Sequence, residues 1–499
     1  MAINQDDIIY FVLTDRFFGK TNPDLKDIDK TKPRAFHGGN FEGLIKKIPY
    51  LKKLGITAVW ITPVYLQTPN ISPDEAGYHG YWTLDFNAVD PHLYIDNGKY
   101  EKGSKLYLKD LVDELHRNDL KIVLDMVVNH TGYGHPAITG EYNPTPIKKE
   151  WFNSQMDFGS DTIKGQLSGL PDFNLGMIDV SDYHITTILS WIEETGIDAI
   201  RMDTARHVEK VFWTYFKNQV KGDHPEVTLI GEVLEFDIDS ISQYQEHFAF
   251  DSLFDFPMQM AMKNVFIYDN PLTTFVTPYN SGSGILERDT HYTNHNKLVT
   301  LHDNHDLEAR FMSLALKHVG GDENRERAVW VVKLALSFMF TIRGIPQIFY
   351  GTEYGMEGWG DPDNRRDFNW ELFDDKYDVK PQFKFEKEMF EHTQKLIKIR
   401  KSNDALTCGN FVCLYVDSFV LVFLRYIEEN VVITIIHNGW LPMSDPLRIS
   451  IITNDQVPNR IKEILDYSVL TCQLTGEKVS VNNGVFKIKM ERKSAMILK

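Results

Sequence analysis

The stretch Gly196-Ile-Asp-Ala-Ile-Arg-Met-Asp-Thr-Ala-Arg-His207 joins a short apolar run to a cluster of charged side chains. The run Ala199–Asp203 has the length and the composition of a buried strand. Asp203, Arg206 and His207 stand at its carboxyl end, which is the end where barrel enzymes assemble their active sites. The stretch therefore predicts a barrel strand that delivers one carboxylate and two basic side chains to a common site.

Runs of the same kind recur along the chain and alternate with helical patterns, as in repeated strand–helix units around a parallel sheet. The predicted strands are Ile8–Arg16, Ala58–Val64, Ile122–Val128, Ala199–Asp203, Val227–Val233, Ser252–Phe256, Leu298–His302 and Ile345–Tyr350. Apolar residues at helical spacing lie in the connections Phe41–Ile48, Leu108–Leu115 and Glu323–Ile342. Eight such units predict an α/β fold, a (β/α)8 barrel of the TIM-barrel type.

Two segments do not follow this alternation. Segment 132–180 is rich in Gly, Pro and Asn and is too long for a plain connection after the third strand, so we expect a small inserted subdomain. After Asn403 the pattern changes to strands and predicts a C-terminal all-β domain. The expected division is a barrel in two parts, 1–131 and 181–403, an inserted subdomain B, 132–180, and a C-terminal β-sandwich domain, 404–499.

The charge balance excludes some classes of partner. The 499 residues include 53 Lys and Arg against 70 Asp and Glu, a net charge of −17. Nucleic-acid binding needs clustered cations, so no nucleic-acid partner is expected.

The N-terminus lacks the regions of a signal peptide, and no apolar run is long enough to cross a membrane. The simplest expectation is a cytoplasmic protein without a membrane partner, or a secreted one if a signal peptide has been removed.

The carboxyl ends of four predicted strands are unusually polar, namely Asp125–His130, Arg201–His207, Gly231–Glu232 and His302–Asp306. A lone acidic residue at such a place is more often a helix cap or an ion-pair partner, but four such ends together favour a catalytic site. Glycoside hydrolysis needs one carboxylate to attack the anomeric carbon and one carboxylic acid to protonate the leaving oxygen. A neighbouring Arg keeps the first group ionised, and poor solvation keeps the second protonated. The residue types therefore indicate a glycosidase.

These strand ends resemble the short motifs that define the α-amylase family of glycoside hydrolases. The matching segments are Asp125–His130, Gly196–His207, Glu232 and Asn304–Asp306. Supporting matches are Gly55–Val64, Tyr78–Trp82, Leu170–Asn174 and Gly344–Glu353, so the resemblance runs through nearly the whole chain. It implies a retaining enzyme that acts on α-linked glucans.

Position by position, the resemblance implies three catalytic carboxylates. Asp203 would be the nucleophile, Glu232 the general acid and base, and Asp306 the group that grips sugar hydroxyls in the transition state. The residues expected to orient these groups or to bind the sugar are Tyr81, His79, His130, Arg201, Arg206, His207 and His305. Among them, Arg201 would orient Asp203, and Tyr81 would stack under the sugar ring.

The resemblance also implies Ca²⁺ as a cofactor. In relatives that bind it between the barrel and the insertion, the ligands match Asn129, Asp172 and the backbone carbonyl of His207, and oxygen donors suit a hard cation. The alternative is that Asn129 and Asp172 only hydrogen-bond the insertion. The usual first Asp of an N-terminal site in cyclodextrin-forming relatives is missing here. A second calcium site could still use Asn22, Asp24 and Asn40.

The preferred glucan stays open within the family. The Arg206-His207 pair favours hydrolysis of α-1,4 bonds in starch or maltooligosaccharides. However, Asn174 stands where typical amylases carry Asp, and Asp361–Arg366 is similar to the corresponding loop of cyclodextrin-active members and glucanotransferases. The alternative is a cyclodextrin hydrolase, an α-1,6-acting glucosidase or a 4-α-glucanotransferase. The sequence does not predict the oligomeric state.

Two other classes of protein fit the sequence less well. A non-catalytic barrel, like certain amino-acid transporter subunits, would carry a membrane anchor and lack the full carboxylate set. A barrel enzyme of phosphorylated metabolites would carry a Gly-rich phosphate loop near strands seven and eight, where this chain has acidic strand ends. The expected partner is therefore an uncharged α-glucan or maltooligosaccharide.

Overall fold

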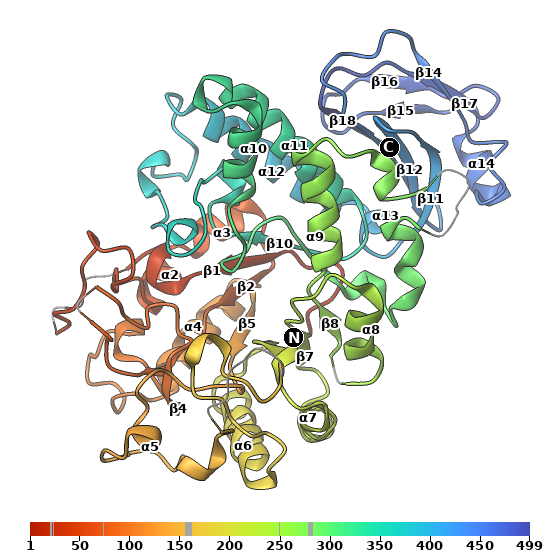
Figure 1. The fold of residues 1–499 in the computed structure, drawn as a ribbon. Helices are drawn as coiled ribbons and strands as arrows, with labels where there is room; N and C mark the ends of the chain where they lie inside the picture. Colours follow the sequence, from red (N-terminus) through yellow and green to blue (C-terminus); the bar gives the residue numbers. More distant parts are fainter. Residues whose placement is uncertain (20–21, 23, 73, 155–161, 249, 278–282) are drawn as a thin grey trace.

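The structure is a computed structural model that describes residues 1–499 except 20–21, 23, 73, 155–161, 249 and 278–282. Its centre is a sheet of eight strands in the order β8-β7-β6-β5-β2-β1-β10-β9, with parallel neighbours throughout (Figure 1). An isolated parallel bridge between Phe254 and Val299 joins the two edges. The strands are β1 (Ile9–Val12), β2 (Ala58–Ile61), β5 (Lys121–Met126), β6 (Ala199–Met202), β7 (Thr228–Gly231), β8 (Ser252–Leu253), β9 (Val299–Leu301) and β10 (Ile345–Phe349).

The predicted (β/α)8 barrel is confirmed, since each predicted strand overlaps an observed one. The observed strands are mostly shorter at their carboxyl ends. In the first unit β1 ends at Val12, and Asp15 and Arg16 belong to a single helical turn, α1 (Thr14–Phe17). The chain leaves the sheet there because the polar residues after each strand belong to the loops above the barrel.

Helices cover the outside of the barrel (Figure 1). They are α2 (Phe41–Lys46), α3 (Ile48–Leu54), α4 (Leu106–Arg117), α6 (Ile178–Thr195), α7 (Lys210–Asp223), α8 (Ile238–Glu246), α9 (Phe256–Met262), α10 (Phe311–Val319), α11 (Arg325–Thr341) and α12 (Lys384–Lys401). The first connection, predicted as one helical pattern, holds two helices. The N–H of Lys47 closes α2 on the carbonyl of Leu44, and Pro49 lies in the first turn of α3. Proline has no N–H to continue the first helix, so the pattern divides.

One hairpin was not predicted from the sequence. Strand β3 (Tyr65–Gln67) pairs antiparallel with β4 (Thr83–Val89) directly after β2. In β4 the buried residues do not alternate regularly with exposed ones, which removes the usual signal of a strand. The hairpin matters because its connecting segment carries His79 and Tyr81 to the carboxyl ends of the barrel strands.

The inserted segment lies between β5 and α6. Among its described residues it contains α5 (Pro136–Thr139) and the 3-10 turns η2 (Lys149–Trp151) and η3 (Leu167–Gly169). Phe173, which is buried, stacks on Phe152 with ring centroids 4.6 Å apart and fixes the end of the insertion. The proposed boundaries at 131/132, 180/181 and 403/404 remain predictions. Within the described chain, every helix is too short or too polar to cross a membrane.

The C-terminal residues form the predicted β domain, with two short helices added, α13 (Asp404–Thr407) and α14 (Asn459–Leu465). Its main sheet is antiparallel in the order β11-β12-β13-β18, beside the pairs β14-β17 and β15-β16. The strands are β11 (Asn410–Val416), β12 (Val420–Ile427), β13 (Asn430–His437), β14 (Leu447–Ser450), β15 (Val469–Thr471), β16 (Lys478–Ser480), β17 (Val485–Ile488) and β18 (Ser494–Leu498).

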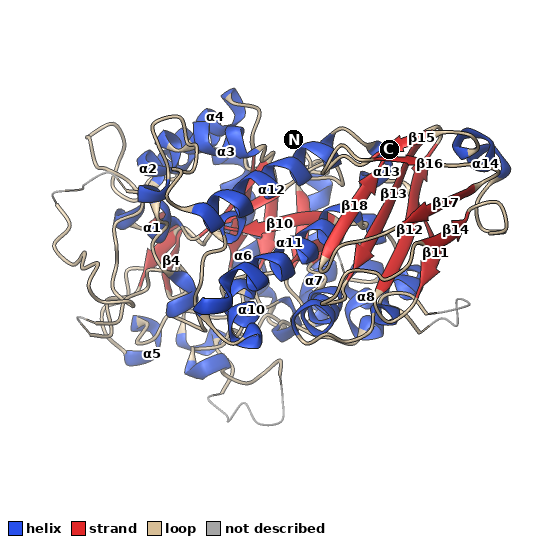
Figure 2. Ribbon diagram, turned by 90° about the horizontal axis from the view of Figure 1, so that it is seen from above, coloured by secondary structure: helices blue, strands red, loops and turns tan. Residues whose placement is uncertain are grey.

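Helix α11 joins this domain to the barrel. Figure 2 shows the C-terminal sheet beside the barrel, with α11 close to β18, and the two elements are in contact. Phe338 of α11 stacks on Phe275, with ring centroids 4.1 Å apart, and makes an edge contact with Phe423 of β12 at 6.3 Å. Leu421 and Phe423 join the core of the barrel, whereas the alternate residues Val422 and Leu424 join the core of the C-terminal domain.

Aromatic rings fill the barrel below the strand ends. Phe11 stacks on Trp60 with ring centroids 3.6 Å apart and on Phe349 at 5.0 Å, and Trp60 contacts Phe254 at 5.3 Å. These residues come from four different strands or strand ends and are buried. They form an apolar floor, so charged groups placed on top of it are poorly solvated.

Candidate active site

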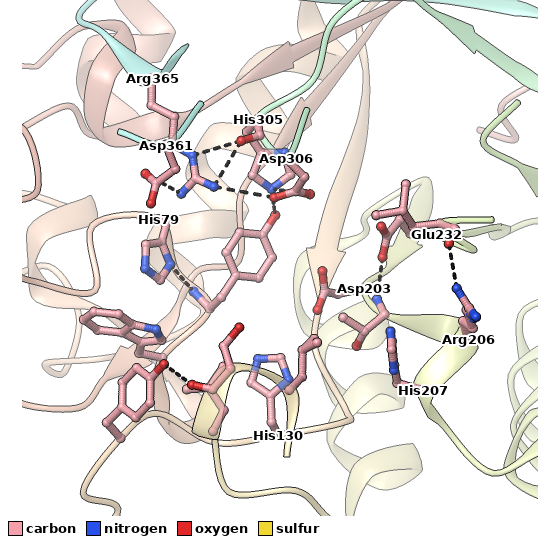
Figure 3. A pocket seen from close by; sticks show the side chains of 18 of the residues that line it. His79, His130, Asp203, Arg206, His207, Glu232, His305, Asp306, Asp361 and Arg365 are labelled. Atoms are coloured by element: carbon pink, nitrogen blue, oxygen red, sulfur yellow. Dashed lines mark hydrogen bonds and ion pairs between the residues drawn. The ribbon is translucent and has the colours of Figure 1, made fainter. Parts of the chain in front are cut away.

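A cavity of about 430 Å³ opens at the carboxyl ends of the barrel strands (Figure 3). Of the residues predicted for catalysis and sugar binding, all but Arg201 line it. Figure 3 shows two groups of side chains on either side of Asp203. His79, His305 and Asp306 lie on one side, and Glu232, Arg206 and His207 lie on the other.

Arg201 lies beneath the cavity and is fully buried. It stands two residues before Asp203, so both side chains leave the same face of the extended chain. Its Nη1 lies 2.6 Å from Oδ1 of Asp203 and 2.9 Å from Oδ1 of Asp125. Its Nη2 lies 3.6 Å from Oε2 of Glu232. One guanidinium therefore contacts three carboxylates, and it favours the ionised form of each.

Glu232 directly follows β7 and is 6% exposed. Its Oε2 accepts a hydrogen bond of 2.8 Å from the N–H of Thr204. Burial raises the pKa of Glu232 to about 8. Arg201 and the Thr204 N–H oppose this rise, whereas the negative charges of Asp203 and Asp306 add to it. Glu232 can therefore hold a proton at neutral pH, which a general acid must do.

Tyr81 and His305 form a stacked pair beside Asp125. Their ring centroids are 5.4 Å apart at an angle of 14°. The hydroxyl of Tyr81 donates to Oδ2 of Asp125 at 2.8 Å and lies 2.7 Å from Nε2 of His305. Because the phenol O–H of Tyr81 already donates its hydrogen bond to Asp125, it cannot donate to His305. We therefore assign the His305 proton to Nε2, which donates to the phenol oxygen. Trp60 donates to the same Asp125 oxygen at 3.1 Å, so this carboxyl is surrounded by donors.

His79 reaches the cavity from a turn that requires glycine. Gly80 has φ +89°, and a Cβ there would lie 2.2 Å from the carbonyl oxygen of Pro63. Nδ1 of His79 accepts from the N–H of Tyr81 at 3.0 Å, which leaves the protonated Nε2 as a donor. Burial, together with the charge of Arg365, lowers the pKa of His79 well below its usual range. His79 is therefore a neutral donor.

His130 and His305 are also neutral at the site. Burial lowers the pKa of each, and Arg365 and Arg201 lower that of His305 further. Nε2 of His130 has no hydrogen-bond partner among the residues that the structure describes. Neutral imidazoles that line a cavity can donate to or accept from uncharged hydroxyl groups.

Asp306 ends the polar segment after β9, and its side chain is 34% exposed. Oδ1 of Asn304 accepts from the N–H groups of Asp306 and Leu307, at 2.9 and 3.0 Å, which forms a tight turn. The carboxylate of Asp306 lies 3.3 Å from Nε2 of His305 and 3.5 Å from Nη2 of Arg365. Unlike Asp203 and Glu232, it has no contact with Arg201 among the described interactions.

Arg206 and His207 lie on the opposite side of the cavity. Nη1 of Arg206 donates to the carbonyl of Leu234 at 3.1 Å, and Nη2 lies 3.2 Å from Oε2 of Glu235. Nδ1 of His207 donates to the carbonyl of Thr162 at 2.8 Å, and burial lowers the pKa of His207. The pair therefore connects the loop after β6 to the insertion and to the loop after β7.

Sequence reasoning did not select several residues that line the cavity. Arg365 and Asp361 come from the loop after β10, and Arg34 comes from the loop after β1. The carboxylate of Asp361 lies 3.0 Å from Nη1 of Arg34 and 3.4 Å from Nη1 of Arg365. It also accepts a hydrogen bond of 3.0 Å from the hydroxyl of Tyr78. The only available signal for this cluster was the position of Asp361–Arg366 directly after a barrel strand. Other lining residues not selected are Glu75, Trp82, Tyr133, Leu167, Ser168, Leu170, Thr204 and Leu234.

The residues expected to hold calcium are buried near the base of the insertion. Asn129 and Asp172 are 1% and 2% exposed, and residues 130 and 172 form a β-bridge. Oδ2 of Asp172 accepts from Nδ2 of Asn153 at 2.8 Å. The donor types fit calcium, but these residues and the His207 carbonyl supply only part of the six to eight oxygens that it takes. The described residues contain no cluster of three or more His, Cys, Asp or Glu that could hold a metal.

The residues of the suggested second calcium site have other partners. Oδ1 of Asn40 caps α2 by accepting from the N–H of Gly43 at 2.9 Å. Oδ1 of Asn22 accepts from the N–H of Asp24 at 3.1 Å, and its Nδ2 donates to the carbonyl of Tyr94. Residues 20, 21 and 23 of the same loop lie outside the described residues. This second site stays a prediction.

Comparison with known proteins gives a family for this geometry. The family model "Alpha amylase, catalytic domain" matches residues 11–409. The Beta/alpha-amylase of Paenibacillus polymyxa is 30% identical over 510 residues, which cover 98% of this chain but 37% of that protein. A cyclomaltodextrinase of Thermoanaerobacter pseudethanolicus is 30% identical, with 87% of this chain and 70% of the relative covered. The crystal structure of an Anoxybacillus alpha-amylase superposes with a TM-score of 0.82 at 32% identity, over 99% of this chain and 97% of that one. This chain belongs to the α-amylase family.

Proposed function

We propose that the protein hydrolyses α-1,4-glucosidic bonds in starch or maltooligosaccharides with retention of configuration. The observation that carries the proposal is that Asp203 and Glu232 share the guanidinium of Arg201 but contact it at different distances. Asp203 makes a short ion pair with Arg201, whereas Glu232 lies 3.6 Å from the same group and has a pKa raised to about 8 by burial. A nucleophile and a general acid in one cavity are the two groups that a retaining glycosidase needs.

In the first step, a carboxylate oxygen of Asp203 forms a bond to the anomeric carbon. The bond from that carbon to the glycosidic oxygen breaks, its electron pair goes to the oxygen, and the proton of Glu232 moves to the same oxygen. The leaving glucan then departs with a new hydroxyl group, and the ionised Glu232 remains beside the glycosyl ester of Asp203.

In the second step, Glu232 acts as a base. It removes a proton from water while the water oxygen bonds to the anomeric carbon and the ester bond to Asp203 breaks. Asp203 leaves as a carboxylate that Arg201 stabilises, and Glu232 is protonated again. Two inversions at one carbon retain the α configuration.

The remaining groups of the cavity fit an uncharged sugar. His79, His130 and His305 are neutral, and Tyr81 offers an aromatic face. Asp306 would accept hydrogen bonds from sugar hydroxyls, which strengthen as positive charge develops on the ring. This donor and acceptor set supports an α-glucan as substrate. The three arginines that line the cavity, Arg34, Arg206 and Arg365, are each paired with a carboxylate, which makes them poor ligands for a phosphate.

Asn174 and the loop Asp361–Arg366, the two sequence features that did not decide the preferred glucan, lie in different places relative to the cavity. Asp361 and Arg365 line the cavity, so the loop after β10 contributes to glucan selection. Asn174 instead accepts from the N–H of Gly176 at 3.2 Å and is not among the lining residues. The similarity to a cyclomaltodextrinase keeps cyclodextrin hydrolysis as the second candidate, together with α-1,6 cleavage and glucan transfer.

Product analysis separates these candidates. Soluble starch, maltooligosaccharides, cyclodextrin and pullulan would be digested in parallel, with Asp203→Asn as the control for the assigned nucleophile. The proposal expects starch and maltooligosaccharides to be cleaved fastest into shorter linear products. Faster cleavage of cyclodextrin or pullulan, or elongated products, would replace it by the second candidate. Full activity of Asp203→Asn would refute the assigned mechanism.

We also propose that Ca²⁺ is held by Asn129, Asp172 and the carbonyl of His207. These groups lie on the barrel, on the insertion and beside the cavity, so a bound ion would fix the insertion to the barrel. Its contribution would be structural stability, and no step of the reaction above passes through it.

A further inference from the structure

The backbone around Asp306 is held by two asparagines that come from different loops. Asn304 binds the N–H groups of Asp306 and Leu307 from one side, as described above. From the other side, Nδ2 of Asn364 donates to the carbonyl of His305 at 3.0 Å and to the carbonyl of Leu307 at 3.1 Å. The two carbonyls that flank Asp306 in sequence are thus joined by one amide group.

Asn364 belongs to the 3-10 turn η11 (Asp363–Arg365) in the loop after β10, and it is fully buried. Both neighbours of its Nδ2 are acceptors, which decides the orientation of the amide. Its Oδ1 has no partner among the residues that the structure describes. Among the described residues, Asn364 therefore acts through the two N–H donors of its amide.

Asn364 is itself fixed by a buried arginine. Nε of Arg310 donates to the backbone carbonyl of Asn364 at 2.9 Å, and its Nη1 donates to the carbonyl of Tyr350 at 2.7 Å. The guanidinium of Arg310 is fully buried over the ring of Phe349, at 4.0 Å from its centroid. The turn that carries Asn364 is therefore anchored to the end of β10, which is part of the rigid barrel.

We infer that Asn364 is a positioning residue that holds Asp306 in its catalytic place. The inference rests on the proposed role of Asp306 as the carboxylate that grips the distorted sugar. Arg365, the next residue, donates to the same carbonyl of His305 from Nε and Nη2, both at 3.1 Å, and its Nη2 also reaches Asp306. One short turn thus contacts both the backbone around Asp306 and its carboxylate.

The position of Asp306 affects the pKa of Glu232, and this effect can be measured in the pH profile. Glu232 faces Arg201, Asp203, Asp306 and the N–H of Thr204, and the charge of Asp306 is one of the causes that raise the pKa of Glu232. If the turn loosens, Asp306, which is already partly exposed, moves toward solvent. The general acid then loses its proton at lower pH, so the alkaline limb of kcat/KM shifts downward.

The test compares Asn364→Ala with Asn403→Ala. Asn403 is also buried, its Nδ2 donates to the carbonyl of Ile399 at 2.6 Å, its Oδ1 has no partner in the described part of the chain, and it is not a lining residue of the cavity. We expect Asn364→Ala to lower kcat on maltooligosaccharides by about 10²-fold with KM little changed, as for a catalytic group displaced by about 1 Å. We also expect its alkaline limb to move to lower pH, whereas Asn403→Ala should lower only the melting temperature.

Asn364→Ser is a second variant that keeps one donor and should lie between the wild type and Asn364→Ala in kcat. The inference is overturned if the Asn364 variants keep the wild-type kcat and pH profile, or if Asn403→Ala changes both as much. Asp306→Asn separates this result from the proposed function. Full activity of Asp306→Asn would show that the role of Asp306 is wrong, whereas an inactive Asp306→Asn beside a fully active Asn364→Ala would reject the positioning role alone.

Discussion

Arg201 and Asp203 stand two residues apart on one strand end, and Nη1 of the first lies 2.6 Å from Oδ1 of the second. The cation that stabilises the nucleophile thus comes from the same strand and not from a loop. Since side chains alternate along a strand, this contact is fixed by the pairing of β6 with its neighbours. The cation beside the nucleophile is therefore supplied by the barrel sheet itself.

Replacing Arg201 by lysine tests this arrangement. A single ammonium group cannot contact Asp125, Asp203 and Glu232 with the geometry of a planar guanidinium. We expect kcat on soluble starch to fall by about 10²-fold or more, comparable to the loss of one preorganised donor. Arg343→Lys is the matched control, because Arg343 is buried between Asp255 and Asp289 outside the cavity. It should lower stability without lowering kcat; equal losses of kcat in both variants would argue against a specific role of Arg201.

Replacing Glu232 by glutamine should affect substrates according to their leaving group. Hydrolysis of starch needs a proton on the leaving oxygen, so we expect a loss of about 10³-fold or more, within the range of general acid catalysis. Formation of the glycosyl ester from an α-maltosyl fluoride needs no such proton and should be largely retained, as measured by fluoride release in a rapid first phase. Asp203→Asn should lose both reactions. Equal losses of Glu232→Gln on both substrates would contradict its role as general acid.

The raised pKa of Glu232 also predicts how stability depends on pH. The folded protein keeps the proton up to about pH 8, whereas an unfolded chain loses it near the ordinary value of 4.5. The folded state therefore binds the extra proton between these values, and its stability falls as pH rises through this window. Glu232→Gln removes this loss, so its melting temperature should equal that of the wild type near pH 4 and exceed it by a few degrees at pH 9. A constant difference across this range would contradict the raised pKa.

Tyr81 separates ring stacking from hydrogen bonding. Tyr81→Phe keeps the aromatic face but removes the hydroxyl that links Asp125 to Nε2 of His305. We expect kcat to fall by about 10- to 100-fold, since a hydrogen bond to a charged group contributes about 1.5–3 kcal/mol and about 1.4 kcal/mol is a factor of ten. Tyr81→Ala removes the face as well and should raise KM in addition. If the Phe variant raises KM as much as the Ala variant, the hydroxyl rather than the ring contacts the sugar.

Calcium binding can be tested without an activity assay. If Asn129, Asp172 and the His207 carbonyl hold the ion, chelation should lower the melting temperature by several degrees, and added calcium should restore it. Asp172→Asn should melt near the chelated wild type and respond to neither treatment. An unchanged melting temperature of the wild type after exhaustive chelation would reject a strongly stabilising site.

The sequence predicted the barrel and the core of the site for the same reason. Runs such as Ala58–Ile61 are apolar throughout because parallel strands are buried on both faces. The polar residues that follow other strands, such as Asp203 and Glu232, then stand out. The divided helix at Pro49 could also have been predicted, since proline gives a local signal. These features depend on neighbours in sequence.

The contributions of the loop after β10 could not be predicted in the same way. Arg365 and Asn364 act on His305 and Asp306, about 60 residues earlier in the chain. Such contacts depend on how two loops meet above the barrel, and no periodic pattern records them. The hairpin of β3 and β4 was missed for a related reason, because both of its faces are partly covered and the alternation of a half-exposed strand is lost.

The contacts of Phe338 with Phe275 of the barrel and Phe423 of the C-terminal sheet limit how this protein can be engineered. From Ala328 to Thr341, helix α11 is buried except at Trp330 and Lys333, so deletion of segment 404–499 would expose apolar side chains such as Phe338 to water. A truncated barrel would expose that apolar surface and should aggregate during expression. A chimera with the C-terminal segment of another relative would need side chains matched to Phe338. The catalytic barrel and the segment that follows it therefore have to be exchanged together.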